Sequence, residues 1–291
     1  MSWLVTGGSG QLGIAISSEL EKRGISFGAP GSQELDVTQN SNIKDSIRRY
    51  APKVIVNCAA WTDVDAAEAE EVLAKKVNSD AVALLALAAR ASRAKLIHVS
   101  TDYVFSGDQQ PPWQVDDLLD PKSAYGRTKA DGEKRLLSLY PENSIIVRTA
   151  WLYSPWGKNF AKTMTRLALK TSGEIQVVND QKGQPTFTDD LAEQIIEIGC
   201  SNSPAGIYHG TNAGQATWYE FAQEIFKLAD ADVNRLIPIS SSEYPRVAKR
   251  PSNSVLSHDA WTEIQIDPMR EWRHALAEAM PAIISAVNAE E

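Results

Sequence analysis

Tyr125 and Lys129 are the pair of side chains in this sequence whose types and spacing most clearly suggest acid–base chemistry. They are four residues apart, and residues at that spacing lie on one face of a helix. A free tyrosine has a pKa near ~10, and a neighbouring ammonium favours the phenolate and lowers that pKa. The phenol could then pass a proton to a carbonyl oxygen. Because isolated pairs of this kind also occur on solvated helices, the surrounding residues must support the catalytic interpretation.

Hydroxyl side chains follow a short apolar run upstream of this pair. Lys95 to Val99 is predicted to be a buried strand, and Ser100 and Thr101 come directly after it. Ligands bind at the carboxyl ends of strands in open α/β sheets, where a hydroxyl can hydrogen-bond a carbonyl and orient it. We expect Thr101 to have this role, with Ser100 as the alternative. His98, inside the strand, is interpreted as a core residue.

A glycine-rich loop precedes both groups, at the start of the chain. Gly7, Gly10 and Gly13 are spaced three apart, with Gln11 and Leu12 between them, after one predicted strand and before one predicted helix. Glycine permits a tight turn and the close approach of a pyrophosphate, and a helix N-terminus offers free N–H groups to phosphates. This context favours a dinucleotide-binding loop over an ordinary turn.

The end of the second predicted strand indicates which dinucleotide fits. No acidic residue stands within residues 28–32, where a carboxylate would hold the adenosine 2′-hydroxyl. The absence of that carboxylate permits the 2′-phosphate of NADPH. No arginine stands there either, so the sequence gives no basis for excluding NADH.

The elements that must position these residues alternate between short apolar runs and helical patterns, which is typical of a parallel sheet covered by helices. The fold class is therefore α/β, a Rossmann-like doubly wound parallel sheet with a smaller C-terminal substrate lobe. Residues 1–150 are expected to form the dinucleotide-binding domain with a return segment at 175–200, and 151–291 mainly the substrate lobe. Residues 240–257 are expected to be an irregular loop. The predicted strands are Trp3–Thr6, Ile25–Ala29, Val54–Val56, Lys95–Val99, Ser144–Arg148 and Ile175–Val178. The predicted helices are Leu12–Arg23, Asn42–Tyr50, Glu71–Ser92, Ser123–Tyr140, Phe160–Lys170, Thr188–Ile198, Trp218–Ala229 and Pro268–Val287.

Composition excludes several classes of protein. With 43% hydrophobic and 23% charged residues the chain is typical of folded soluble proteins, and a net charge of −8 argues against a nucleic-acid surface. We expect no nucleic-acid partner, no membrane span and no export signal, hence a cytoplasmic protein. Two cysteines, Cys58 and Cys200, exclude a disulfide framework. The four histidines show no metal-ligand spacing, so we expect no catalytic metal.

The motifs together resemble the dTDP-4-dehydrorhamnose reductase family of extended short-chain dehydrogenases/reductases. The resemblance extends over almost the whole chain, and the glycine loop and the Tyr-x-x-x-Lys pair are common to the whole superfamily. Three other stretches are far more specific: Asn57-Cys58-Ala59-Ala60-Trp61-Thr62, Arg148-Thr149-Ala150-Trp151 and Asp180-Gln181-Lys182-Gly183-Gln184-Pro185-Thr186.

The resemblance implies roles for further residues. Asp36 and Val37 would lie near the adenine, and Asp102, Tyr103 and Trp151 would contact the nucleotide sugar. Arg250 would lie near the substrate diphosphate or at the junction of the lobes. The remaining residues implied near the cofactor are Ala59, Ala60, Thr62 and Asn78. The flat ring of Trp151 could stack on a sugar or thymine, or simply pack between the lobes.

Tyr103 also distinguishes related chemistries. Dehydratases that resemble this chain usually carry Thr-Asp-Glu here, and the Glu serves water elimination. Because Tyr103 occupies the position of that Glu, simple carbonyl reduction is favoured.

Two departures from the family pattern bear on metal and assembly. Ala15 stands where some members have a Glu that binds Mg²⁺ at a dimer interface, although Asp189 could supply another ligand. A Mg²⁺-bridged dimer therefore does not follow, and we expect a monomer or weak homodimer. Ser257 replaces an Asp at the end of the Arg-Pro-x-x-Ser-x-Leu stretch, which affects loop packing rather than chemistry.

The family reading predicts NADPH-dependent reduction of the C4 keto group of dTDP-4-dehydro-L-rhamnose. Thr101 would position the carbonyl, Tyr125 would protonate the oxygen and Lys129 would tune Tyr125. Two alternatives stay open: reduction of another keto-deoxy nucleotide sugar, and a non-catalytic NADP-binding role like that of a regulatory subunit of methionine adenosyltransferase.

Overall fold

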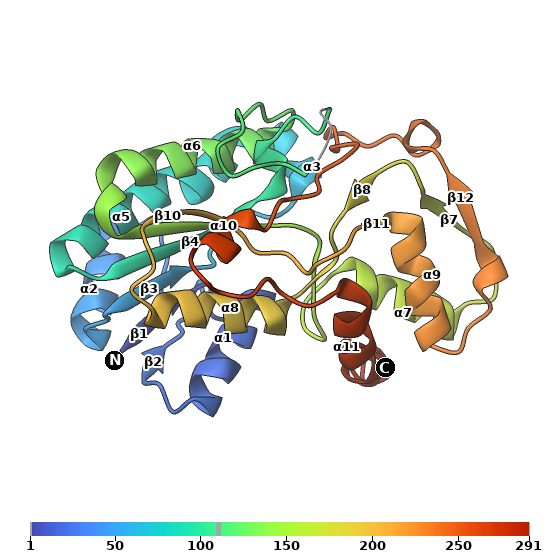
Figure 1. Cartoon of the computed structure of the whole chain (residues 1–291), viewed down its shortest axis with the longest axis horizontal. Helices are drawn as coiled ribbons and strands as arrows, with labels where there is room; N and C mark the ends of the chain where they lie inside the picture. Colours follow the sequence, from blue (N-terminus) through green and yellow to red (C-terminus); the bar gives the residue numbers. More distant parts are fainter. Residues whose placement is uncertain (1, 109–111, 291) are drawn as a thin grey trace.

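The computed structural model describes residues 2–108 and 112–290; Met1 and Glu291, the outer bounds of the predicted domains, lie outside this range. Figure 1 shows a helix-covered sheet at one end of the molecule and a smaller group of helices and short strands at the other. Among the described residues, no helix is both long and apolar enough to cross a membrane.

The main sheet has six strands in the order β10-β5-β4-β3-β1-β2, and every neighbouring pair is parallel. This confirms the predicted Rossmann-like doubly wound sheet. The strand order reverses between β1 and β3, which is where such sheets bind nucleotides. The strands are β1 (Trp3–Thr6), β2 (Phe27–Gly28), β3 (Val54–Asn57), β4 (Lys95–Thr101), β5 (Ser144–Thr149) and β10 (Gly206–His209).

Side chains of the central strands pack on both faces of the sheet. In β1, Trp3 and Val5 join one hydrophobic cluster, whereas Leu4 joins another on the opposite face. Burial on both faces explains why β1 and β3 begin with three consecutive apolar residues rather than alternating. One face is covered by α1 (Gln11–Lys22) and α8 (Thr188–Cys200), and the other by α2 (Asn40–Tyr50), α5 (Ala81–Ser92) and α6 (Ala124–Leu139).

The long helix predicted over 71–92 is interrupted. It consists of α4 (Glu71–Lys75), a π-helical turn at Lys76–Asp80, and α5. At this turn α6 approaches so closely that a Cβ on Gly132 would meet the Asn78 carbonyl oxygen at 2.2 Å. A widened turn is a local solution to such contacts, and the sequence period does not reveal it. The short helix α3 (Val64–Ala69) before it was also not predicted.

The second group of elements has its own hydrophobic cluster, which includes Phe221, Phe226 and Trp272. β7 (Ile175–Val178) pairs with β12 (Leu236–Ile239), so this strand belongs here rather than to the main sheet. The predicted C-terminal helix starts at Trp272 instead of Pro268, because Glu271 caps it by accepting a hydrogen bond from the Arg273 amide. The helices are α7 (Phe160–Lys170), α9 (Trp218–Leu228) and α11 (Trp272–Asn288).

Short segments connect the two ends of the molecule. β6 (Leu152–Tyr153) pairs with β9 (Thr186–Phe187), and β8 (Lys182–Gly183) pairs with β11 (Ala216–Thr217). The chain returns to the main sheet through α8 and β10, and α10 (Asp259–Glu263) places Trp261 in the cluster beneath that sheet. Within the predicted loop 240–257, only a 3₁₀ turn at Ser241–Glu243 is regular. Other 3₁₀ turns are Asp102–Val104, Pro141–Asn143 and Val233–Arg235.

Candidate active site

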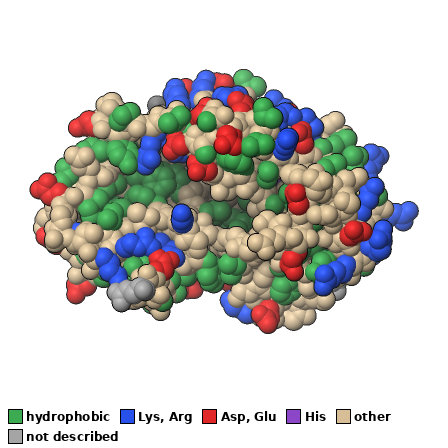
Figure 2. Space-filling model, turned by 180° about the vertical axis from the view of Figure 1, so that it is seen from behind, with side chains coloured by type: hydrophobic (Ala, Val, Ile, Leu, Met, Phe, Trp, Pro, Cys, Tyr) green, Lys and Arg blue, Asp and Glu red, His purple; other side chains and the backbone are tan. Residues whose placement is uncertain are grey.

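A cavity of about 850 Å³ lies at the carboxyl ends of β1, β3, β4 and β5. Figure 2 shows this side of the molecule hollowed, with hydrophobic side chains in the depression. Most of the predicted site residues line it together: Gly7, Gly10, Gln11, Leu12, Gly13, Asp36, Val37, Ala59, Ala60, Thr62, Thr101, Asp102, Tyr103, Tyr125, Lys129 and Trp151. Asn78 and Arg250 are not among its lining residues.

The glycine loop is closed tightly and leaves the start of α1 open. Gly7 has φ +67°, and a Cβ on Gly13 would meet the Gly7 carbonyl oxygen at 2.3 Å, so neither position accommodates a side chain. Gly10 precedes α1 and no side chain caps the helix. The free N–H groups of the first turn are therefore available to an anion, as the predicted phosphate site requires.

Gln11 is bonded within the protein rather than left to a ligand. Its Oε1 accepts hydrogen bonds from Ser154 Oγ at 2.9 Å and Asn159 Nδ2 at 2.8 Å. Gly157 lies against its side chain, and Gly157, Lys158 and Asn159 also line the cavity. Gln11 thus joins the phosphate loop to the segment before α7. The sequence reasoning did not find this segment, although Asn159 directly before a helical pattern is an N-cap signal.

The cavity wall also contains Asp36 and Val37. The Asp36 carboxylate accepts hydrogen bonds from the Thr38 hydroxyl at 2.7 Å and from the Thr38 amide at 2.9 Å. These bonds lower the pKa of Asp36. The side chain therefore stays ionised and fixes the loop that forms this part of the cavity wall.

Thr101 and Tyr125 meet at the centre of the cavity. The Thr101 side chain hydrogen-bonds Tyr125, which acts to lower the Tyr125 pKa, but burial of the phenol is the larger effect and raises it. Thr101 Oγ1 also donates to Asp102 Oδ1 at 3.0 Å and accepts from the Tyr103 amide at 3.2 Å. The Tyr103 ring packs edge-on against Tyr125 with centroids 5.6 Å apart. The two hydroxyls are thus held together with the phenol protonated.

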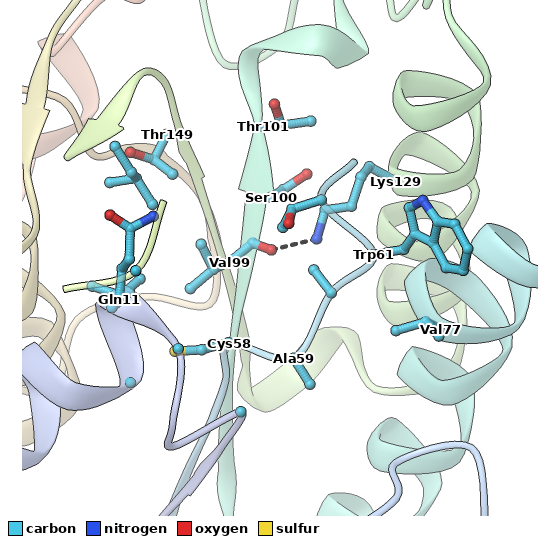
Figure 3. A pocket seen from close by; sticks show the side chains of 18 of the residues that line it. Gln11, Cys58, Ala59, Trp61, Val77, Val99, Ser100, Thr101, Lys129 and Thr149 are labelled. Atoms are coloured by element: carbon cyan, nitrogen blue, oxygen red, sulfur yellow. Dashed lines mark hydrogen bonds between the residues drawn. The ribbon is translucent and has the colours of Figure 1, made fainter. Parts of the chain in front are cut away.

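Lys129 extends from α6 toward β4, where its Nζ donates to the Val99 carbonyl oxygen at 2.6 Å (Figure 3). Burial is the largest effect on its pKa and lowers it to about 8, against opposing contributions from Glu133 and Cys58. The sequence suggested that Lys129 lowers the pKa of Tyr125. In the structure, burial and the Thr101 bond dominate that pKa instead.

Two other hydroxyls face the cavity without a protein partner. Ser100 Oγ and Thr149 Oγ1 are buried and make no hydrogen bond with the described residues (Figure 3). Nearby, burial raises the pKa of Asp102 to about 6. Buried polar atoms without partners cost free energy, so they indicate groups that a ligand would satisfy. Thr149 had no predicted role.

Trp151 forms part of the junction between the sheet and the second group of elements. Its ring stacks on Trp218 with centroids 3.5 Å apart and an interplanar angle of 9°. Its backbone has φ +48°, which is unfavourable for a residue with a side chain, and a Cβ on Gly183 would meet its ring at 2.5 Å. One face of the ring is therefore occupied by the protein, while Trp151 still lines the cavity.

Asn78 and Arg250 lie behind the cavity wall. Asn78 bonds the backbone N–H and carbonyl of Trp61 and the Thr128 hydroxyl, so it holds the loop that carries Ala59 to Thr62. Arg250 donates to the Tyr103 hydroxyl at 3.0 Å and to Asp65 Oδ2 at 2.9 Å. Each one supports residues that do line the cavity.

These features fit a bound dinucleotide. The open helix start after a loop without side chains suits a pyrophosphate, and the buried hydroxyls and Lys129 supply polar groups further along the same cavity. The described part of the chain shows no comparable site for a metal ion. Residues 2–108 and 112–290 contain no group of three or more His, Cys, Asp or Glu side chains that could hold one. Ala15 lies in the core.

Known proteins resemble this chain over nearly its whole length. A protein of Streptomyces antibioticus named as a probable dTDP-4,6-dihydroxy-2-methyloxan-3-one 4-ketoreductase is 45% identical over 287 residues, covering 98% of this chain and 97% of that protein. A dTDP-4-dehydrorhamnose reductase of Streptomyces griseus is 44% identical over 285 residues, covering 97% and 93%.

A solved structure of a related reductase also resembles this chain over nearly its whole length. The dTDP-4-dehydrorhamnose reductase of Bacillus anthracis, crystallised in complex with NADP, superposes with a TM-score of 0.92 at 35% identity, covering 96% of this chain and 98% of that one. The family model described as the RmlD substrate binding domain matches residues 1–284, so the chain belongs to that family, as the resemblance in its motifs predicted.

Proposed function

We propose that the protein is an NADPH-dependent reductase of the C4 keto group of a dTDP-4-keto-6-deoxy sugar, dTDP-4-dehydro-L-rhamnose in the first instance. The observation that carries this proposal is the Thr101–Tyr125 hydroxyl pair, which shares one cavity with Lys129 and with the open start of α1. These residues combine a proton donor with a loop that could bind a dinucleotide. Reduction of a carbonyl by a nicotinamide needs a source of the proton and a site for the hydride donor.

In the proposed reaction, the hydride that reduces the carbonyl carbon would come from NADPH when it is bound. Tyr125 donates its phenolic proton to the oxygen as negative charge develops there. Its raised pKa keeps that proton in place before the reaction. The Thr101 hydroxyl would turn its one hydrogen from Asp102 to the same oxygen. The Lys129 ammonium would bond the nicotinamide ribose and favour the phenolate that Tyr125 leaves behind.

The choice of cofactor follows from the start of the chain. The glycine loop and the first turn of α1 would hold the pyrophosphate, with Asp36, Val37, Ala59 and Ala60 around the rest of the nucleotide. The Bacillus anthracis relative was crystallised with NADP, which supports NADPH. We propose that NADH is also accepted, because residues 28–32 contain neither an acidic nor an arginine side chain to discriminate.

The choice of substrate rests on the relatives and on four residues. Both curated relatives are named for reduction of dTDP-linked sugars, but of different sugars. We propose that Asp102, Tyr103 and Trp151 hold the nucleotide sugar and that Arg250 acts on it through Tyr103. We also propose that the protein works in the cytoplasm as a monomer or weak homodimer without Mg²⁺, since Ala15 offers no ligand.

The direct test mixes the protein with NADPH and dTDP-4-dehydro-L-rhamnose and follows the reduced-nicotinamide absorbance. We expect turnover, a dTDP-L-rhamnose product by NMR, and a loss of about 10² to 10⁴-fold in kcat for Tyr125→Phe. Turnover only with other dTDP-keto sugars would reassign the substrate. NADP⁺ binding without turnover of any keto sugar would support the non-catalytic subunit instead.

A further inference from the structure

A chain of buried hydrogen bonds runs from Lys129 away from the cavity and into the sheet. Lys129 Nζ lies 3.4 Å from His98 Nε2, His98 Nδ1 lies 3.0 Å from Asn57 Nδ2, and Thr6 Oγ1 lies 2.6 Å from Asn57 Oδ1. All four side chains are at most 2% exposed. This series of hydrogen bonds links β4, β3 and β1. The reaction proposed above makes no use of His98, Asn57 or Thr6.

With the Asn57 amide oriented as it is in the structure, the order of hydrogen-bond donors sets the position of the histidine proton. The Thr6 hydroxyl donates to Asn57 Oδ1, so the Asn57 amide nitrogen faces His98 Nδ1. An amide nitrogen only donates, hence Nδ1 must accept and the ring carries its hydrogen on Nε2. Burial, and then Lys129, lower the pKa of His98, so the ring stays neutral.

The Nε2 hydrogen of His98 therefore points at Lys129 Nζ. An ammonium has only donors, so it gains nothing from an N–H group, whereas a neutral amine can accept a hydrogen bond from it. The other groups that act on this nitrogen are Glu133 on α6 and the Cys58 thiol after β3, both of which favour the charged form. Glu133 is itself paired with Arg148. His98 is thus the neighbour on β4 that opposes the charge.

We propose that His98 is a positioning residue for the reaction: with Asn57 and Thr6 it holds a single tautomer against Lys129 and so sets how readily the lysine gives up its proton. Besides the contributions of Glu133 and Cys58, the hydrogen bond to the Val99 carbonyl oxygen stabilises the ammonium of Lys129. This inference rests on Lys129 serving the reduction proposed above.

The tautomer can be measured in the cofactor-free protein by ¹⁵N NMR of the histidine rings, with His98→Gln used to assign the signal. We expect His98 to carry its hydrogen on Nε2 and not to titrate between about pH 5 and 9. A hydrogen on Nδ1, or a His98 ring that titrates near its usual pKa, would overturn the proposal. Because no sugar is involved, the outcome does not depend on the proposed activity.

The consequence for Lys129 can be measured with Thr6→Val. This variant removes the bond that Thr6 donates to Asn57 Oδ1. The Asn57 amide can then turn its oxygen toward His98 Nδ1, which moves the ring hydrogen there and leaves Nε2 as an acceptor for the ammonium. We expect the Nδ1 tautomer to become populated. We also expect the pH at which NADP⁺ affinity falls to rise by about one unit.

The matched control is Thr211→Val, which removes an equally buried hydroxyl that bonds a different histidine, His258, at 2.8 Å. It should leave the pH dependence of NADP⁺ affinity as in the parent protein. Equal pH profiles for the two variants would overturn the proposal, since they would show that losing a buried threonine hydroxyl, and not the tautomer, is what matters.

Discussion

At the scale of single residues, burial shifts the pKa values of Lys129 and Tyr125 in opposite directions. Both shifts suit the proposed reaction. Burial favours the neutral form of any group. For Lys129 the neutral form is deprotonated, so its pKa falls to about 8, whereas for Tyr125 the neutral form is protonated, so its pKa rises. At neutral pH the cavity therefore contains the Lys129 ammonium, which loses its proton readily, and the Tyr125 phenol, which keeps its proton.

The pH dependence of the reaction follows from these directions. Lys129 is charged below its pKa of about 8 and neutral above it. We expect kcat/KM for the reduction to fall as pH rises through that value, because the ribose and the forming phenolate lose their cationic partner. A pH–rate profile with saturating NADPH would measure it. A profile flat to pH 10 would contradict the assigned role of Lys129.

At the scale of the element, α6 connects the proposed catalytic residues to the sheet. Tyr125, Lys129 and Glu133 follow one another at intervals of four on the same helix. Ser123 caps the start of the helix, because its Oγ accepts a hydrogen bond from the Gly126 amide. Near the middle of the helix, the Glu133–Arg148 ion pair fixes it to β5. Arg148 also donates to the Val115 carbonyl oxygen. The position of the helix face that carries Tyr125 and Lys129 thus depends on this buried pair.

Glu133→Gln should therefore destabilise the fold. Glu133 and Arg148 are 1% and 2% exposed, and removing one partner leaves a buried charge unpaired, at a cost of about 3 to 5 kcal/mol in the free energy of unfolding. Urea denaturation would measure this. The control is Glu142→Gln, which breaks the exposed pair with Arg90 and should change the free energy of unfolding by less than about 1 kcal/mol. Equal effects would contradict the anchoring role.

At the scale of the whole molecule, the segment 240–257 leaves the second group of elements and returns across the cavity wall. The Ala248 amide donates to Asp65 Oδ1, and Arg250 bonds both Asp65 and the Tyr103 hydroxyl. Asp65 belongs to α3, beside the main sheet, so these bonds join distant parts of the chain. They also hold the Tyr103 ring against Tyr125.

Arg250→Ala should weaken sugar binding without weakening cofactor binding. Loss of both bonds frees Tyr103, and we expect KM for the nucleotide sugar to rise about tenfold, equivalent to about 1.4 kcal/mol. NADP⁺ affinity, measured by fluorescence titration, should stay unchanged. The adjacent exposed cation provides the control, because Lys249→Ala should alter neither quantity. A parallel loss of NADP⁺ affinity would show that the segment supports the entire cavity.

The sequence predicted features that depend on neighbouring residues and missed those that depend on distant ones. The glycine loop, the Tyr125/Lys129 spacing and the apolar strands are local patterns, and the structure assembles all of them. β10 is only four residues long and joins the sheet from far along the chain, so no periodicity marks it. Motif matching assigned Gln11 and Asn78 to the predicted cofactor site but could not show that their side chains bond the protein. Side-chain partners depend on tertiary packing, which local sequence does not encode.

The stacked indoles of Trp151 and Trp218 give the molecule a built-in optical probe. Parallel rings 3.5 Å apart couple their electronic transitions, so the pair should contribute its own signal to the near-ultraviolet circular dichroism. Trp151 stands directly beyond the main sheet, whereas Trp218 begins α9. The signal would therefore follow the relative placement of the two ends of the molecule while ligands enter the cavity between them, without any added label.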